Sequence, residues 1–302
     1  CRDDKVKLAM DVAKKEFSLT QGMQHERCAN VYIGIPFCPT ICAYCSFSSF
    51  PAGRYRDKMD AYLDALEKEM MQCEEWLAGK QMVSVYVGGG TPTSLSEEQF
   101  ERLMAMTEKY LPMEQSKEFT VEAGRPDSIT EGKLRSMKIH GVTRISINPQ
   151  SMKEHTLELL GSKHTVEEIR EKFMLARTLG FDNINMDLIA GLPEETLEDF
   201  KETLREVEAL KPDSITVHTL VIKRASRLRK EQLEQGGEMR EEDACIEPMQ
   251  KEAEQFCRVH GYEPYYMYRQ KNKAHTTRNT NQENVAYAKP GKECLYNIFI
   301  ME

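Results

Sequence analysis

Residues 31–47 read VYIGIPFCPTICAYCSF. The first five of them are apolar and mostly β-branched, which predicts a short buried strand. Three cysteines, Cys38, Cys42 and Cys45, follow within eight residues, and Phe47 stands where a fourth cysteine could have come. Three thiolates are one ligand short of a tetrahedral zinc site or a four-iron cluster. Another part of the chain or a non-protein group must therefore supply the fourth ligand.

Five further segments have the same short, apolar and β-branched character as the strand expected at 31–35: 82–87, 118–122, 142–147, 183–188 and 214–222. Segments with helical periodicity lie between them, at 57–78, 96–110, 164–179 and 196–210. Ser96 with Gln99 and Thr165 with Glu168 predict capping boxes at two of these helices. Alternating strands and helices predict a parallel sheet with right-handed crossovers, and six such units favour an α/β fold with an incomplete (βα)6 barrel.

The unusual residues follow the expected strands one after another. The cysteine loop follows the first strand and the sequence GGGTP, residues 88–92, follows the second. Glu122, Gln150 and Asp187 come at or after the ends of the third, fourth and fifth strands. Because the carboxyl ends of parallel strands meet at one edge of a barrel, these residues predict a single site there.

The chain divides into three expected regions. Residues 1–28 form a helical N-terminal remnant, residues 29–225 the barrel, and residues 226–302 a C-terminal helical region on the substrate side, with a helix at 241–260 that contains Pro248. The tail after that helix has no clear period. Because the chain opens on a cysteine rather than a methionine, we expect it to be part of a longer product.

The composition is that of an ordinary globular protein, with 40% hydrophobic and 30% charged residues in 302. A net charge of 41 − 49 = −8 argues against a general nucleic-acid surface. No apolar run has the length of a membrane span, and charges occupy the start where a signal peptide would be apolar. These features predict a cytoplasmic protein without nucleic-acid or membrane partners.

The cysteine loop has two serious interpretations. In the first, Cys28 or a distant histidine such as His25 completes a structural zinc site. In the second, the three thiolates hold a four-iron, four-sulfur cluster with one iron left for an exogenous ligand. Three unligated thiols on one loop would invite oxidation. Cys73, in contrast, continues the apolar series of its helix and is expected to pack.

With the strand before it and Tyr44 before the last cysteine, the loop resembles the signature of radical S-adenosylmethionine (SAM) enzymes. Five stretches together resemble the oxygen-independent coproporphyrinogen III dehydrogenase (oxidase) family: YIGIPFCPTICAYCSF, VYVGGGTPTSL, FTVEAGRPD, INMDLIAGLP and KPGKECLYN. The last of them, with YYMYRQKN before it, most resembles the variant of that family found in anaerobic and spore-forming bacteria. The resemblance implies a radical SAM barrel, a [4Fe–4S] cluster, and SAM as the missing fourth ligand. It also implies oxidative decarboxylation of two propionates of coproporphyrinogen III to vinyl groups, giving protoporphyrinogen IX. Relatives with the same barrel act as haem chaperones without turnover, which is the alternative.

The same resemblance implies the site residues. Cys38, Cys42 and Cys45 would ligate the cluster, and no side chain is needed as a catalytic acid or base. Contacts to SAM would come from Tyr32, Gly89, Gly90, Thr91, Glu122, Gln150 and Asp187, with backbone near Ile189 and Val221 beside the adenine. The ordinary alternative for Glu122 is an ion pair with Arg144.

Two positions depart from the dehydrogenase pattern. Phe47 stands where the dehydrogenases carry a fourth cysteine and the chaperone-type relatives an aromatic residue. Ser162 stands where the family has an arginine beside the cofactor; the neighbouring Lys163 could replace its charge but not its planar fork.

The substrate would be coproporphyrinogen III, or haem in the alternative, and the electron donor a flavodoxin or ferredoxin. A tetracarboxylate needs local positive charge, which the sequence KRASRLRK at 223–230 offers through Arg224 and Arg227; a solvated helix start is equally consistent with it. His218 is expected to be a packed core histidine and, less so, a haem ligand. The tyrosines Tyr265, Tyr266 and Tyr268 would either stack on a tetrapyrrole or belong to an edge strand.

Overall fold

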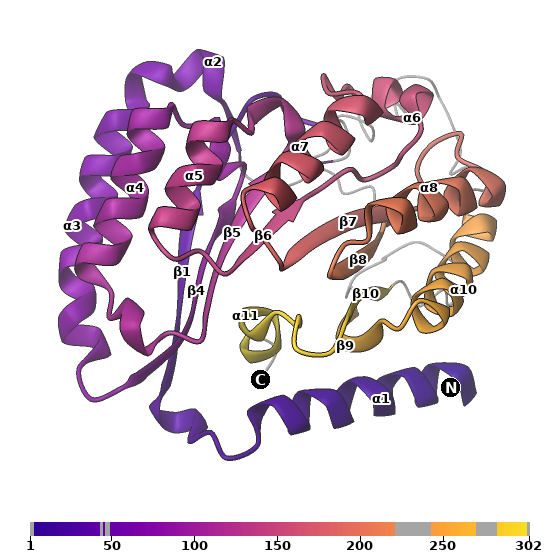
Figure 1. Cartoon of the computed structure of the whole chain (residues 1–302), viewed down its shortest axis with the longest axis horizontal. Coiled ribbons are helices and arrows are strands. Elements are labelled where there is room, and N and C mark those ends of the chain that lie inside the picture. The colour runs from indigo at the N-terminus through magenta and orange to yellow at the C-terminus, as the bar shows by residue number, and fades with distance from the viewer. Residues whose placement is uncertain (1–2, 43–44, 46–48, 221–242, 270–282, 301–302) are drawn as a thin grey trace.

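The strands of the computed structural model form one curled sheet with six parallel and two antiparallel members (Figure 1). The structure describes residues 3–42, 45, 49–220, 243–269 and 283–300. The sheet order is β1-β4-β5-β6-β7-β8-β10-β9. The bounds are β1 Cys28–Ile35, β4 Gln81–Gly89, β5 Glu118–Gly124, β6 Arg144–Ile147, β7 Ile184–Ala190, β8 Ser214–Thr219, β10 Glu283–Ala288 and β9 Glu263–Arg269. The six predicted parallel strands are confirmed.

The C-terminal region, expected to be helical with a tail of no clear period, also contains the last two strands of the sheet. Strand β10 pairs antiparallel with β8, and β9 pairs antiparallel with β10 as the edge of the sheet. Neither strand has the apolar, β-branched run that marked the parallel strands: β9 reads EPYYMYR and β10 reads ENVAYA. For the three tyrosines the edge-strand interpretation is therefore confirmed, with Tyr265 buried and Tyr268 exposed.

The predicted helices are present between the parallel strands. They are α3 Met59–Leu77, α4 Glu97–Tyr110, α7 Val166–Thr178 and α8 Leu197–Leu210. Both predicted capping boxes form, at Ser96 with Gln99 and at Thr165 with Glu168. Two shorter helices, α5 Glu131–Ile139 and α6 Glu154–Leu159, were not anticipated because their apolar patterns span too few turns. The short pieces α2 Ala52–Tyr55, β2 Phe37–Cys38 and β3 Phe50–Pro51 flank the cysteine loop.

The two faces of the sheet differ in chemistry because strand side chains alternate. On one face, residues such as Val85, Val121 and Ile145 are fully buried in the main apolar core. Figure 1 shows helices α3, α4, α5, α7 and α8 along that side. The opposite face carries polar side chains that contact one another across strands, such as Tyr86 with Glu122 and Ser214 with Asn185.

The N-terminal helix and the C-terminal elements cover the last strands. Helix α1 Asp3–Thr20 buries Leu8 and Val12, and its Lys15 Nζ lies 2.6 Å from a carboxylate oxygen of Glu263 on β9. The predicted helix around Pro248 is α10 Asp243–Val259. Helix α11 Leu295–Phe299 ends the described chain, where Glu118 of β5 accepts a 2.6 Å hydrogen bond from the Leu295 N–H. Within the described ranges no helix is both long and apolar enough to cross a membrane.

Candidate active site at the carboxyl edge of the sheet

The glycine loop after β4 is held directly against the strand that leads to the cysteines. The N–H of Gly90 donates to the Ile35 carbonyl at 2.7 Å, and the N–H of Thr91 donates to the Phe37 carbonyl at 2.7 Å. A Cβ added to Gly90 would lie 2.6 Å from the Phe37 carbonyl oxygen and 3.0 Å from the Cys38 Sγ. Only glycine permits this approach, which brings the Thr91 hydroxyl within 3.6 Å of the Cys38 Sγ.

The three cysteines of the loop lie in different surroundings. Cys38 is half-buried at the end of β2, and burial raises the pKa of its thiol although the Thr91 hydrogen bond opposes that shift. Cys42 is buried, and its carbonyl accepts a 3.1 Å hydrogen bond from the N–H of half-buried Cys45. Tyr44 and Phe47 lie outside the described residues. In the part of the chain that is described, no three His, Cys, Asp or Glu side chains converge as ligands of one metal ion.

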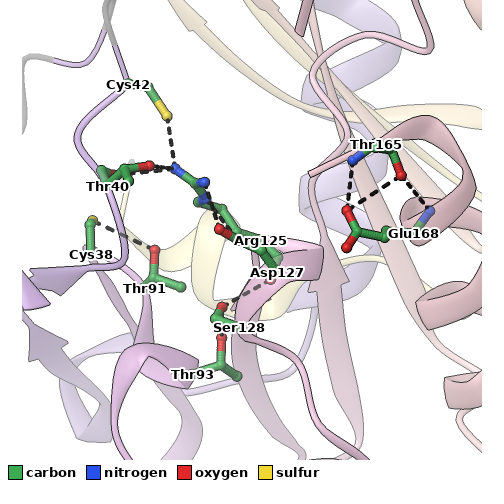
Figure 2. A network of polar contacts seen from close by, with 10 residues as sticks. All are labelled: Cys38, Thr40, Cys42, Thr91, Thr93, Arg125, Asp127, Ser128, Thr165 and Glu168. Carbon is green, nitrogen blue, oxygen red and sulfur yellow. Dashed lines mark hydrogen bonds and ion pairs between the residues drawn. The ribbon is translucent and has the colours of Figure 1, made fainter. Parts of the chain in front are cut away.

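Arg125 is a residue of this site that the sequence argument missed. It follows β5 directly, is 5% exposed, and reaches the cysteine loop, where its Nη1 lies 3.7 Å from the Cys42 Sγ (Figure 2). The signal in the sequence was an arginine and an aspartate, Arg125 and Asp127, two residues apart just after a strand end. Such a pair is ordinary on a surface, so it did not stand out.

Glu122 stands on the polar face of β5. Its carboxylate accepts a 2.6 Å hydrogen bond from the Tyr86 hydroxyl, and burial raises the pKa of Glu122 to about 7. A Cβ on Gly88 would lie 2.9 Å from the Glu122 carboxyl carbon, so this glycine makes the room that the carboxyl occupies. The alternative ion pair with Arg144 is not formed: the Arg144 guanidinium donates to the Ser214 hydroxyl at 3.2 Å.

Asp187 lies on β7 beside His218 of β8. The Asn185 amide donates to Asp187 at 2.6 Å, and the His218 Nε2 lies 3.6 Å from the other carboxylate oxygen. Burial opposes ionisation of Asp187, but the ion pair with His218 and the hydrogen bonds from Asn185 and Thr216 together outweigh it, so the pKa of Asp187 is lowered. Burial also opposes the charge of His218, but the carboxylates of Asp187 and Glu122 together outweigh it and raise the pKa of His218. The expectation of a packed core histidine is wrong, because the His218 side chain is 38% exposed and faces this carboxylate.

Gln150 is brought beside Asp187 by an unusual backbone. Its φ is +66°, its N–H donates to the Asp187 carbonyl at 2.9 Å, and its carbonyl accepts from the Ile189 N–H at 3.0 Å. The side-chain oxygen of Gln150 is buried without a hydrogen-bond partner among the described residues, as are Asn148 Oδ1 and Ser162 Oγ. Buried polar atoms of this kind are costly unless a ligand or water satisfies them.

Tyr32 lies on β1 and is 50% exposed. Its ring stacks on Tyr86 at 5.9 Å and on Tyr296 of α11 at 5.8 Å between ring centroids. The predicted SAM contact of Tyr32 stays a prediction. Arg224, Arg227 and Val221 lie outside the described residues.

The described residues fit the two groups that the sequence implied. The backbone cradle at Gly90, the unsatisfied oxygen of Gln150 and the carboxylates of Glu122 and Asp187 lie at the carboxyl edge of neighbouring strands. Three thiols on one loop match the donor set of a cluster, whose ligands each bind a separate iron rather than one central ion.

Comparison with known proteins assigns the class. A model of the radical SAM superfamily matches residues 32–207, so the chain belongs to this superfamily, whose members use a [4Fe–4S] cluster and SAM. This assignment favours the cluster over the structural zinc site considered as the alternative.

Within the superfamily, the chain is similar to three proteins whose names refer to coproporphyrinogen or haem. The chain is 42% identical over 304 residues to the oxygen-independent coproporphyrinogen-III oxidase-like protein HemZ of Bacillus subtilis, covering 99% of this chain and 59% of that protein. It is 37% identical to the haem chaperone HemW of the same organism, over 64% of this chain and 50% of the relative. The solved structure of the coproporphyrinogen III oxidase HemN from Escherichia coli matches with a TM-score of 0.71 at 26% identity, over 92% of this chain and 59% of that one. The chain thus spans between half and 59% of the length of these relatives.

Proposed function

We propose that the protein carries out the oxygen-independent oxidative decarboxylation of coproporphyrinogen III to protoporphyrinogen IX. The observation that carries this proposal is a cluster of contacts at the carboxyl ends of the parallel strands. There Gly90 and Thr91 are hydrogen-bonded to the segment that carries Cys38, and the carboxylates of Glu122 and Asp187 lie near each other. The similarity to the oxidase-like protein HemZ of Bacillus subtilis and to the oxidase HemN of Escherichia coli supports the choice of substrate.

In this proposal Cys38, Cys42 and Cys45 hold the cluster. SAM lies against Tyr32, against Gly89, Gly90 and Thr91, and against Glu122, Gln150 and Asp187. When bound, the cluster and SAM would supply one-electron chemistry that can remove a hydrogen atom from an unactivated carbon. Each of two propionates would lose a hydrogen atom from its β-carbon, carbon dioxide from its carboxylate and one electron to a one-electron acceptor, which leaves a vinyl group.

The chain's own residues would bind and orient these groups. Glu122, only partly ionised at neutral pH because burial raises its pKa to about 7, would ionise fully against the positive charge of SAM. Asp187 is already ionised beside His218 and would accept hydrogen bonds from hydroxyl groups of SAM. Arg224 and Arg227 would pair with substrate carboxylates. A cytoplasmic location and a flavodoxin or ferredoxin as electron donor complete the proposal.

A haem chaperone is the second candidate. Phe47 favours it, because the chaperone-type relatives carry an aromatic residue at that position, and the similarity to HemW agrees. A chaperone would bind haem stoichiometrically and would not form 5′-deoxyadenosine in proportion to a porphyrin product.

The test is an anaerobic assay of the reconstituted protein with reductant, SAM and coproporphyrinogen III, following 5′-deoxyadenosine and protoporphyrinogen IX by chromatography. We expect both products to appear together, and both to vanish in Cys38→Ala. Cys73→Ala is the control, because this half-buried cysteine lies on α3 away from the site. If the porphyrinogen stays unchanged and the protein binds one equivalent of haem, the proposed dehydrogenase function is wrong and the haem chaperone function takes its place.

A further inference from the structure

Arg125 is a buried cation whose surroundings are built around the cysteine loop. It precedes the short 3-10 helix Pro126–Ser128 at the end of β5 and is 5% exposed. A buried guanidinium is stable only when its N–H groups are matched by acceptors. The acceptors of Arg125 therefore show what this residue is arranged to hold.

Asp127 fixes the guanidinium from one side. Its two carboxylate oxygens accept from Nε at 3.0 Å and from Nη2 at 2.8 Å, in the two-pronged geometry that only arginine allows. The remaining nitrogen, Nη1, points to the cysteine loop, where it donates to the Thr40 carbonyl at 3.2 Å and to the Thr40 hydroxyl. The same nitrogen donates to the Cys42 Sγ at 3.7 Å (Figure 2).

The base of this arrangement is rigid. The Ser128 and Thr93 hydroxyls lie 2.7 Å apart, and Thr93 also donates to the Ala123 carbonyl at 2.6 Å. Lys133 Nζ donates to the Thr93 carbonyl at 2.6 Å and to the Ser128 carbonyl at 3.0 Å. These bonds join the turn that carries Arg125 to the loop that carries Thr91, the hydroxyl donor to Cys38. Two of the three loop cysteines thus have a donor held by one buried polar network.

We propose that Arg125 is a positioning residue that holds the cysteine loop ready for the cluster and raises the cluster's reduction potential. The physical reason is that reduction adds negative charge to the cluster, which a nearby positive charge and an N–H donor to a ligating sulfur stabilise. The inference rests on the assignment of Cys38, Cys42 and Cys45 as ligands within the proposed function. It does not depend on porphyrinogen as the substrate.

The experiment measures the midpoint potential of the reconstituted cluster by a redox titration followed with electron paramagnetic resonance, without SAM or porphyrinogen. In Arg125→Gln we expect the equilibrium constant for one-electron reduction to fall about tenfold, which corresponds to ~59 mV. Arg125→Lys keeps the charge and loses the fork, so its potential should lie between those of the wild type and Arg125→Gln. If Arg125→Gln does not bind a cluster, the midpoint potential of Arg125→Lys tests the inference instead, and we expect it to lie below that of the wild type.

Arg177→Gln is the matched control. Arg177 also pairs with an aspartate, Asp213 at 2.7 Å, and donates to two backbone carbonyls. It lies at the amino ends of the strands, near Phe181 before β7, whereas the cysteine loop lies at their carboxyl ends. Its variant should keep the wild-type potential even if it unfolds more easily. Potentials of both Arg125 variants equal to the wild type would overturn the inference. So would a cysteine loop shown not to bind iron, whereas a porphyrinogen that is not turned over contradicts only the proposed reaction.

Discussion

At the scale of single residues, Gly90 is the position where a side chain has no room. Its missing Cβ would lie 2.6 Å from a backbone oxygen, which cannot move without separating the glycine loop from β2. We expect Gly90→Ala to lose most of the iron and acid-labile sulfide bound after anaerobic reconstitution, measured per chain. Gly53→Ala is the control, since nothing lies within 4 Å of its missing Cβ, and it should load as the wild type does. Equal iron in both variants would show that the close approach is not needed.

At the scale of elements, α1 is a part of the fold and not only a leading segment. Leu8 is 1% exposed in the main core, and Lys5 pairs with Glu283 of β10 at 2.7 Å. Leu8→Ala should lower the free energy of unfolding by about 2–4 kcal/mol, because it removes buried methyl groups and leaves a cavity. Urea denaturation measures this change. Met10→Ala on the exposed side of the same helix, at 52% exposure, should change it by less than about 0.5 kcal/mol.

At the scale of the whole molecule, stability without ligands should depend on two carboxyls whose pKa is raised. Glu195, buried and hydrogen-bonded by Ser151, has its pKa raised by burial from 4.5 to about 7, and Glu122 behaves in the same way. The folded state then binds a proton more tightly than the unfolded state. This stability is fully present below pH 4.5, falls as the pH rises toward 7, and is lost above it.

Glu195→Gln should remove its share of that decline, about 3 kcal/mol between pH 4.5 and 7. The measurement is the difference in unfolding free energy between variant and wild type in urea, taken at several pH values across this range. Glu158→Gln, which changes an exposed carboxyl of α6, is the control and should follow the wild type throughout. A difference for Glu195→Gln that does not change with pH would contradict the raised pKa.

The local sequence predicted much of this fold because the relevant interactions are local. Alternation and helical period indicated the parallel strands and their helices, and Ser96 and Thr165 cap helices through bonds to residues three positions away. The cysteine spacing and the glycine loop indicated the class of site. The division into three regions and the individual cofactor contacts stay predictions.

The tertiary structure decided what depends on partners distant in the chain. Strands β9 and β10 extend the sheet because β8 leaves one side free for β10 to pair with. Arg125 belongs to the site because the end of β5 lies beside the cysteine loop, although Cys42 precedes Arg125 by 83 residues in the sequence. His218 faces Asp187 because their strands are neighbours in the sheet. The sequence by itself determined the superfamily and the parallel framework, since both are written in short-range patterns. Only the packed sheet decided which charged groups meet, because the energy of a buried charge depends on what surrounds it and not on its neighbours in sequence.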